Sequence, residues 1–144
     1  WAQAKAFCSW AGIRLPPEAQ WEKAARGGAA RKFPWGNDAP TCQLVNFKDC
    51  ATGPDSVGGH PMGASPYGAL NMAGNVWEWV EDYYSADYYT TGPTTDPPGP
   101  ASGTDAPGRF LRAGPVASLR AGVSEAPSPS GPAPTNTGSG TRGT

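Results

Sequence analysis

Apolar residues near the start of the chain follow a helical spacing. Within residues 1–11, Phe7 and Trp10 stand three positions apart among helix-forming alanines, and Gly12 supplies a stop signal. We therefore predict a helix over residues 1–11, already under way at the first residue. Cys8 lies in the apolar part of this pattern and is predicted to be a packed core thiol.

A second helix is predicted from Pro17 to the glycine pair at residues 27–28. Proline suits the first helical turn because its φ is close to the helical value, and Glu18 lies near the positive end of the helix dipole. The two glycines end the pattern. From this helix Trp21 should face the core.

Closely spaced Gly and Pro residues from residue 29 to residue 70 exclude long helices and central strands. We expect a structured loop region there. Trp35 is interpreted as a structural plug beneath a loop. His60, the single histidine of the chain, is interpreted as a loop residue and not a catalytic base, because no nucleophile motif accompanies it.

Residues 76–80 have the aromatic and β-branched character of a strand. Alternation with period two places Trp77 and Trp79 on one face and Glu78 on the other. A carboxylate between two tryptophans is costly to bury unless it is paired. From the residues alone, its partner could be an Arg side chain or backbone amides. A short strand is also predicted at residues 109–112.

Four tyrosines and two aspartates follow the first predicted strand. Amphipathic aromatic side chains suit binding surfaces, so this set could line a ligand groove, although plain packing is the simpler interpretation. The set comprises Asp82, Asp87, Tyr83, Tyr84, Tyr88 and Tyr89.

The chain has 144 residues, enough for one domain with a core, and its 20 Gly and 17 Pro predict that loops dominate. A formal net charge of -1 gives no electrostatic footprint for nucleic acid. No apolar run approaches the roughly 18 residues of a membrane span. We therefore expect no nucleic-acid partner and no membrane span.

The three cysteines, Cys8, Cys42 and Cys50, are too few for a disulfide framework and lack CxxC metal spacing. Cys42 and Cys50 flank a short loop and would suit one local disulfide in an oxidising compartment. Two free or partly buried thiols are an equally weighted alternative.

Four motifs in order resemble the formylglycine-generating-enzyme (sulfatase-modifying-factor) family. Four in order with plausible spacing are far more specific than any one of them. The resemblance covers residues 1–112 and implies an α+β, duplicated C-type-lectin-like fold with little regular secondary structure, here incomplete at both ends. The motifs are FCSWAG at 7–12, RLPPEAQWE at 14–22, FPWGN at 33–37 and GNVWEW at 74–79.

The resemblance implies a structural calcium site in the segment that contains GNVWEW. By that match Asn71 offers a side-chain oxygen, Gly74 and Val76 offer backbone carbonyls, and Glu78 offers a carboxylate. These hard oxygen ligands suit Ca²⁺.

A second family calcium site matches Asn46 and the carbonyl of Phe47. The downstream ligands of that site fall where this loop is shorter than in the family. Asp49 is therefore the candidate for the acid that completes it.

The resemblance also implies oxidation of a sulfatase cysteine by oxygen at a copper(I) ion held by two cysteines, a soft-ligand site. In the family those cysteines lie in the C-terminal part, whereas no cysteine follows Cys50 here. The chain is thus predicted to lack a catalytic pair. A sulfatase or another peptide is the expected partner, and a non-catalytic, calcium-stabilised ligand-binding or regulatory module is the alternative function.

Beyond residue 112 the sequence loses its aromatic anchors and has too little apolar area to offset the entropy of ordering. Residues 1–112 are predicted to be the partial domain and residues 113–144 a disordered or frameshifted tail. Reading one nucleotide earlier permits Gly-Gly-Ser at residues 113–115 and the family's closing Gly-Phe-Arg near residues 137–140. A single-base frameshift near codon 113 is the hypothesis, and genuine divergence is the rival.

Overall fold

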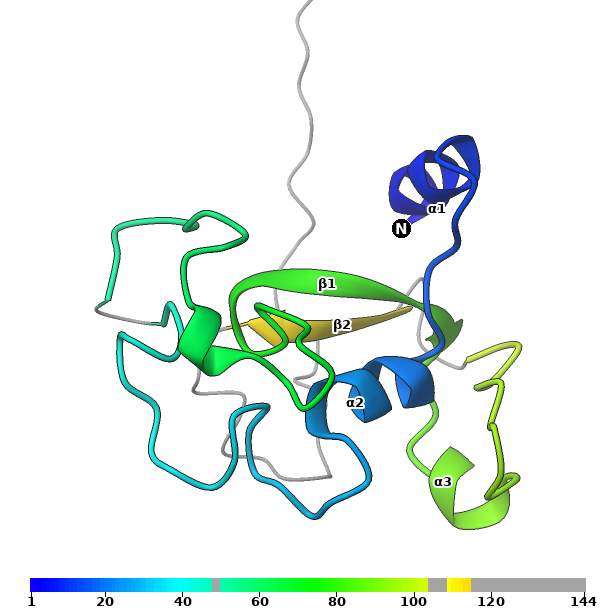
Figure 1. Cartoon of the computed structure of the whole chain (residues 1–144). Coiled ribbons are helices and arrows are strands. Elements are labelled where there is room, and N and C mark those ends of the chain that lie inside the picture. The colour runs from blue at the N-terminus through cyan, green and yellow to red at the C-terminus, as the bar shows by residue number, and fades with distance from the viewer. Residues whose placement is uncertain (48–49, 104–108, 115–144) are drawn as a thin grey trace, which may run out of the picture.

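The computed structural model describes residues 1–47, 50–103 and 109–114, the last range by its backbone. Three α-helices, one 3-10 helix and two strands occur in this part of the chain, and loops connect them (Figure 1). In order they are α1 (Ala2–Trp10), α2 (Glu18–Arg26), η1 (Pro61–Gly63), β1 (Gly74–Tyr83), α3 (Tyr88–Thr91) and β2 (Arg109–Gly114). Predictions about residue 49 and residues 115–144 lie outside the described residues.

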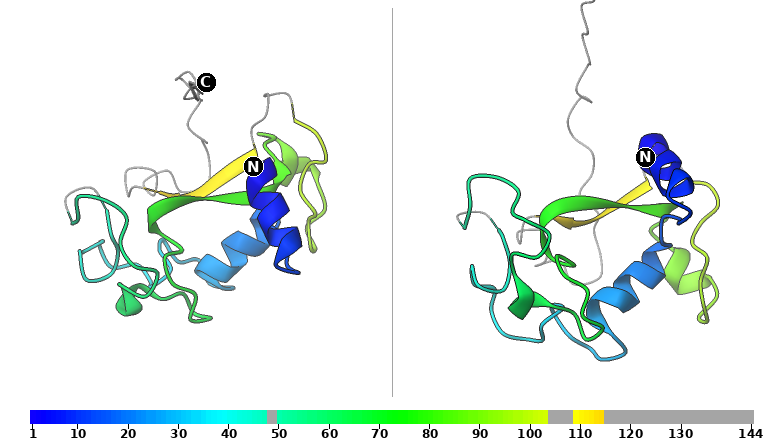
Figure 2. Two further views of the ribbon diagram at one scale, coloured as in Figure 1. Left: turned by 90° about the horizontal axis from the view of Figure 1, so that it is seen from above. Right: turned by 45° about the horizontal axis from the view of Figure 1, so that its top comes forward.

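The centre of the fold is an antiparallel pair of strands, β1 and β2, with α2 against one face (Figures 1 and 2). Val80 of β1 is fully buried and forms the core with Trp21 and Ala25 of α2, and Met72 packs against them. The predicted strand is confirmed and is longer than residues 76–80. The predicted second strand is also confirmed, with its end at Gly114.

The predicted second helix is confirmed as α2. Pro17 precedes its first residue, and Gly27, with a φ of 70°, ends it. Trp21 is 8% exposed, as expected of a core residue. A residue distant in sequence caps the start of this helix: the N–H of Glu18, its first residue, donates to Asp82 Oδ1 at 2.7 Å.

The predicted first helix is confirmed as α1, but the prediction that Cys8 is a core thiol is wrong. No residue of α1 is buried, and Cys8 is half-buried and free. The helix is held by polar contacts at its start: Trp1 Nε1 donates to the Val80 carbonyl at 3.0 Å, and Lys5 pairs with Glu81 at 2.7 Å. An apolar spacing therefore formed a helix without burying its face.

The loop prediction for residues 29–70 is confirmed where the structure describes them, at residues 29–47 and 50–70, since only the short η1 and an isolated bridge between Phe33 and Gly36 interrupt the loops there. Trp35 stacks on Phe33 with ring centroids 5.0 Å apart, and its Nε1 donates to the Asp38 carbonyl at 3.1 Å. Its contacts are local and structural. No helix among the described residues has the length and apolar character to cross a membrane.

The tyrosines after β1 make packing contacts. The Tyr88 hydroxyl accepts a bond from the Gly99 N–H at 3.0 Å, and the Tyr89 hydroxyl donates to Glu18 Oε2. Burial, followed by the nearby charge of Asp82, raises the pKa of Tyr89 to about 12. Tyr88 and Tyr89 thus bond to neighbouring segments, while Tyr89 remains 52% exposed, so the choice between packing and a ligand groove stays open for the set.

Candidate calcium-binding site

The backbone from Asn71 to Glu78 departs from a regular strand. Asn71, Gly74 and Asn75 have φ values of 54°, 70° and 60°, which Gly and Asn tolerate better than other residues. Gly74 pairs with Gly114 and Glu78 with Arg112, so β1 has three residues where β2 has one. Extra residues of a bulge leave the ladder, which is the condition that backbone carbonyl ligands need.

Gly74 lies in close contact with the loop that contains Asn46. A Cβ at Gly74 would stand 2.3 Å from Val45 Cγ2 and 2.4 Å from the Asn46 carbonyl oxygen. The next residue, Asn75, donates its N–H to that same oxygen at 2.8 Å. The segments of the two predicted calcium sites are thus in direct contact.

Glu78 lies on the face of β1 that packs against α2. Its Oε2 accepts a hydrogen bond from Trp21 Nε1 at 2.7 Å. Burial raises the pKa of Glu78, and the Trp21 bond only partly opposes this shift. Among the described side chains no cation pairs with Glu78, so a cation here would offset the cost of the charge.

The partner of the Glu78 carboxylate is therefore the Trp21 indole, and not a backbone amide. The other partner considered was an arginine. Arg112 pairs with Glu78 by its Cα across the sheet, and its side chain lies outside the described ones. The bond to Trp21 agrees with the predicted side for Glu78, whereas Val76 and Trp77 are both exposed, so burial does not alternate with period two where the strand is bulged.

Asn71 is oriented by the loop that precedes it. Its Nδ2 donates to the Val57 carbonyl at 2.9 Å. An Asn side chain has one acceptor and one donor group. With the nitrogen committed to Val57, the side-chain oxygen is the atom suited to a cation.

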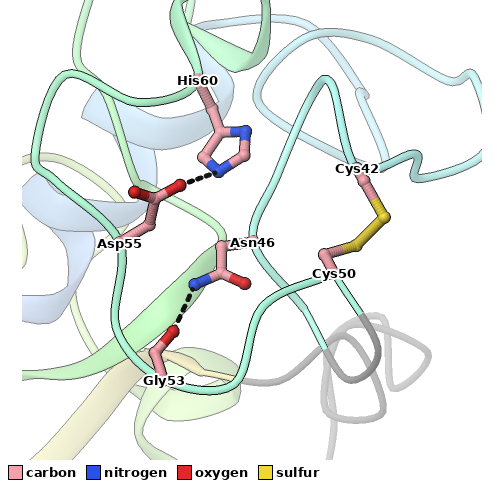
Figure 3. Close-up of a disulfide and its surroundings, with 6 residues drawn as sticks. All are labelled: Cys42, Asn46, Cys50, Gly53, Asp55 and His60. Atoms are coloured by element: carbon pink, nitrogen blue, oxygen red, sulfur yellow. Dashed lines mark hydrogen bonds and ion pairs between the residues drawn. A yellow bond between two sulfur atoms is a disulfide. The ribbon is translucent and has the colours of Figure 1, made fainter.

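The Asn46 side chain is 6% exposed and bridges two segments. Its Nδ2 donates to the Gly53 carbonyl at 3.0 Å and to Asn75 Oδ1 at 3.3 Å. Figure 3 shows its oxygen turned toward the side of Cys50. The Phe47 carbonyl already accepts the Cys50 N–H at 2.8 Å, and a carbonyl oxygen has a second lone pair for an ion.

Asp55 is a described acid whose backbone is linked to Asn46 through Asn75, and it was not among the predicted ligands. Its N–H donates to Asn75 Oδ1 at 2.8 Å, and its carbonyl accepts from Asn75 Nδ2 at 3.2 Å. A simple signal was present: Asp49 and Asp55 are the two acids between Asn46 and Asn71. In the described ranges no three His, Cys, Asp or Glu side chains cluster as metal ligands, so amides and carbonyls must complete either site.

His60 is a loop residue, as predicted, and it is buried. Its Nε2 lies 3.1 Å from Asp55 Oδ2, at ion-pair distance but without hydrogen-bond geometry (Figure 3). Asp55 Oδ1 also accepts the Ser56 N–H at 2.7 Å. His60 thus lies beside the Asp55 carboxylate, directly before η1.

Cys42 and Cys50 form a disulfide, which decides between the two alternatives left open by the sequence. The bond joins Cα atoms 5.3 Å apart across a sequence separation of 8 (Figure 3). It closes the loop that carries Val45, Asn46 and Phe47. The disulfide thus constrains the segment against which Gly74 packs.

We expect loss of this disulfide to destabilise the chain by about 2 kcal/mol, because loop closure removes entropy from the unfolded state. The variant is Cys42→Ser with Cys50→Ser, measured by urea unfolding. The matched control is Cys8→Ser, which changes a half-buried thiol outside the loop. Equal free energies of unfolding for the double variant and the control would show that the disulfide does not stabilise the chain.

Comparison with known proteins identifies the family. Residues 1–135 match the model of the sulfatase-modifying factor enzyme 1-like domain. The chain belongs to this family. The resemblance inferred from the four motifs is therefore confirmed, and the solved structure of Treponema denticola variable protein 1 shares the fold. That structure superimposes with a TM-score of 0.52 at 30% identity, covering 71% of this chain and 36% of that chain.

Relatives in the sulfatase-modifying factor family include two enzyme types. The formylglycine-generating enzyme of Thermomonospora curvata is 44% identical over 119 residues, and that of Streptomyces coelicolor is 41% identical over 130. The hercynine oxygenase of Mycolicibacterium smegmatis is 49% identical over 82 residues. These matches cover 72%, 79% and 54% of this chain, which spans 39%, 39% and 19% of the respective relatives.

Proposed function

We propose that this chain is the calcium-stabilised part of a sulfatase-modifying-factor domain and has no oxidative centre of its own. The fold that goes with this proposal is the α+β, duplicated C-type-lectin-like arrangement. The observation that carries it is the bulged segment from Asn71 to Glu78, which lies against the disulfide-closed loop of Asn46.

The donors of the first site fit calcium. Ca²⁺ takes six to eight oxygen ligands from carboxylates, amides, carbonyls and water. Asn71, Gly74, Val76 and Glu78 would supply such oxygens, and Glu78 would contribute the formal charge. Zn²⁺ and copper prefer nitrogen and sulfur ligands, which this set lacks.

The donors of the second site fit calcium as well. Asn46 and the Phe47 carbonyl would act there with Asp55, in place of the residue 49 first considered. Asn75 bonds to the Asn46 side chain and to the backbone of Asp55, so the two segments adjoin, which supports that grouping. The Asp55 carboxylate, which contacts His60 and the Ser56 N–H, would have to turn to reach the ion. Calcium at either site would stabilise the loops and take no part in a reaction.

The cysteines support the absence of an oxidative centre. The chain has three, and Cys42 and Cys50 are joined to each other. A copper(I) site built from two thiolates would need a pair, and Cys8 alone is free. Oxidation of a sulfatase cysteine would therefore require a cysteine pair that this sequence does not contain.

A non-catalytic binding role is the second candidate, and the exposed side chains of β1 favour it. Trp77 of β1 is 39% exposed, and its neighbour Val76 is 42% exposed. Aromatic side chains that combine a large apolar area with a polar atom suit peptide or small-ligand recognition. On this view the chain would hold a sulfatase or another peptide without oxidising it.

The enzymatic and non-catalytic functions are distinguished by a direct assay. The purified chain, supplied with copper and oxygen, is expected to leave the cysteine of a sulfatase-type peptide unchanged, as measured by peptide mass. The Thermomonospora curvata formylglycine-generating enzyme serves as the positive control. Copper-dependent conversion of the peptide by this chain would refute the proposal that it lacks an oxidative centre.

A further inference from the structure

The Asn75 side chain connects the two candidate calcium sites, although it is a proposed ligand in neither. Its Oδ1 accepts from Asn46 Nδ2 at 3.3 Å and from the Asp55 N–H at 2.8 Å. Its Nδ2 donates to the Asp55 carbonyl at 3.2 Å. Its backbone belongs to the bulge between Gly74 and Val76. The side-chain amide of Asn75, a residue in the bulge of the first site, thus contacts both segments of the second site.

We propose that Asn75 is a positioning residue that makes calcium binding at the two sites positively cooperative. The inference rests on the proposed function. Ordering one site fixes the backbone of residues 74–76. It therefore also fixes the Asn75 side chain, which bonds to the Asn46 side chain and to the Asp55 backbone. The second ion then meets a loop whose ordering entropy has already been lost, which is a source of positive coupling.

The backbone conformation of Asn75 supplies a clean way to isolate its side chain. Its φ is 60°, a value that glycine adopts freely. Asn75→Gly therefore keeps the bulge and the N–H bond to the Asn46 carbonyl but deletes all three side-chain bonds. Asn37→Gly is the matched control, because Asn37 accepts one bond, from the Lys32 N–H at 2.9 Å, in a separate loop.

The test is a calorimetric calcium titration of the chelator-stripped full chain. In the wild type the affinity for the second ion should be at least about fivefold higher than it would be if the two sites were independent. A change of about fivefold is the lower end of the usual coupling between sites. In Asn75→Gly two ions should still bind, with this enhancement below about twofold. Asn37→Gly should retain the wild-type enhancement.

Amide hydrogen exchange distinguishes coupling from a purely structural role of Asn75, because it measures whether calcium at one site protects amides at the other. In Glu78→Gln, where the first site is impaired, calcium at the Asn46 site should still slow exchange across residues 74–76. Adding Asn75→Gly should remove that remote protection. By reciprocity, protection transmitted in one direction implies coupling in the other.

The outcomes separate this inference from the proposed function. Unchanged cooperativity in Asn75→Gly, or an equal loss of affinity at both sites, would overturn it. If the glycine variant does not fold, Asn75→Asp keeps the acceptor and loses the donor to Asp55, and full wild-type cooperativity in that variant would overturn it equally. A wild-type chain that binds no calcium would instead refute the proposed function itself.

Discussion

Gly74→Ala is expected to destabilise the chain by about 3 kcal/mol, through overpacking and a left-handed φ acting together. The new Cβ would stand 2.3 Å from Val45 Cγ2 and 2.4 Å from the Asn46 carbonyl oxygen, at a φ of +70°. The carbonyl is held by its bond from the Asn75 N–H, so it cannot yield without moving the loop. Thermal unfolding in chelator measures the effect as a drop of roughly 10 °C.

Gly68→Ala is the matched control for this effect. Gly68 has a φ of +78°, and a Cβ there would meet nothing within 4 Å. It carries the same backbone strain without the clash and should lose only about 1 kcal/mol. Equal losses in the two variants would mean that the contact between Gly74 and the Asn46 loop is not tight.

We expect Glu78→Gln to be at least as stable as the wild type in chelator but less stable than the wild type in calcium. The pKa of Glu78 is raised above its ordinary 4.5 by burial, so its contribution to stability is complete below pH 4.5 and is lost as pH rises through the folded-state pKa. At pH 7 in chelator, the neutral glutamine should thus match or exceed the wild type. In saturating calcium the wild type should gain about 2.7 kcal/mol at 100 times Kd, and the variant much less.

The measurement is a set of four melting curves, wild type and variant, each in chelator and in calcium. Glu81→Gln is the control, because Glu81 pairs with Lys5 on the other face of β1 and should leave the calcium-dependent part unchanged. If Glu78→Gln gains as much from calcium as the wild type does, the carboxylate is no ligand. Glu78 would then be only the acceptor of the Trp21 bond.

Local signals in the sequence predicted the regular elements well. Pro17 and Gly27 bounded α2 because each has a restricted or unusual backbone preference that acts without tertiary help. The alternation around Glu78 placed that carboxylate on the correct face of β1. These predictions needed only neighbouring residues.

Long-range contacts explain what the sequence did not predict. Cys8 followed an apolar helical spacing, yet α1 has no buried residue, because spacing shows which face is apolar and not whether anything covers it. The grouping of Asp55 with Asn46 depends on Asn75, 20 residues beyond Asp55. The choice between a disulfide and free thiols likewise required the fold that brings Cys42 to Cys50.

A calcium titration of the chelator-stripped chain, followed by its melting temperature and by calorimetry, tests the central claim most directly. We predict a saturable rise in melting temperature, two bound ions per chain, and a much weaker response to Mg²⁺, which demands a smaller octahedral site. A melting temperature that calcium leaves unchanged, with no heat of binding, would contradict the assignment of both sites.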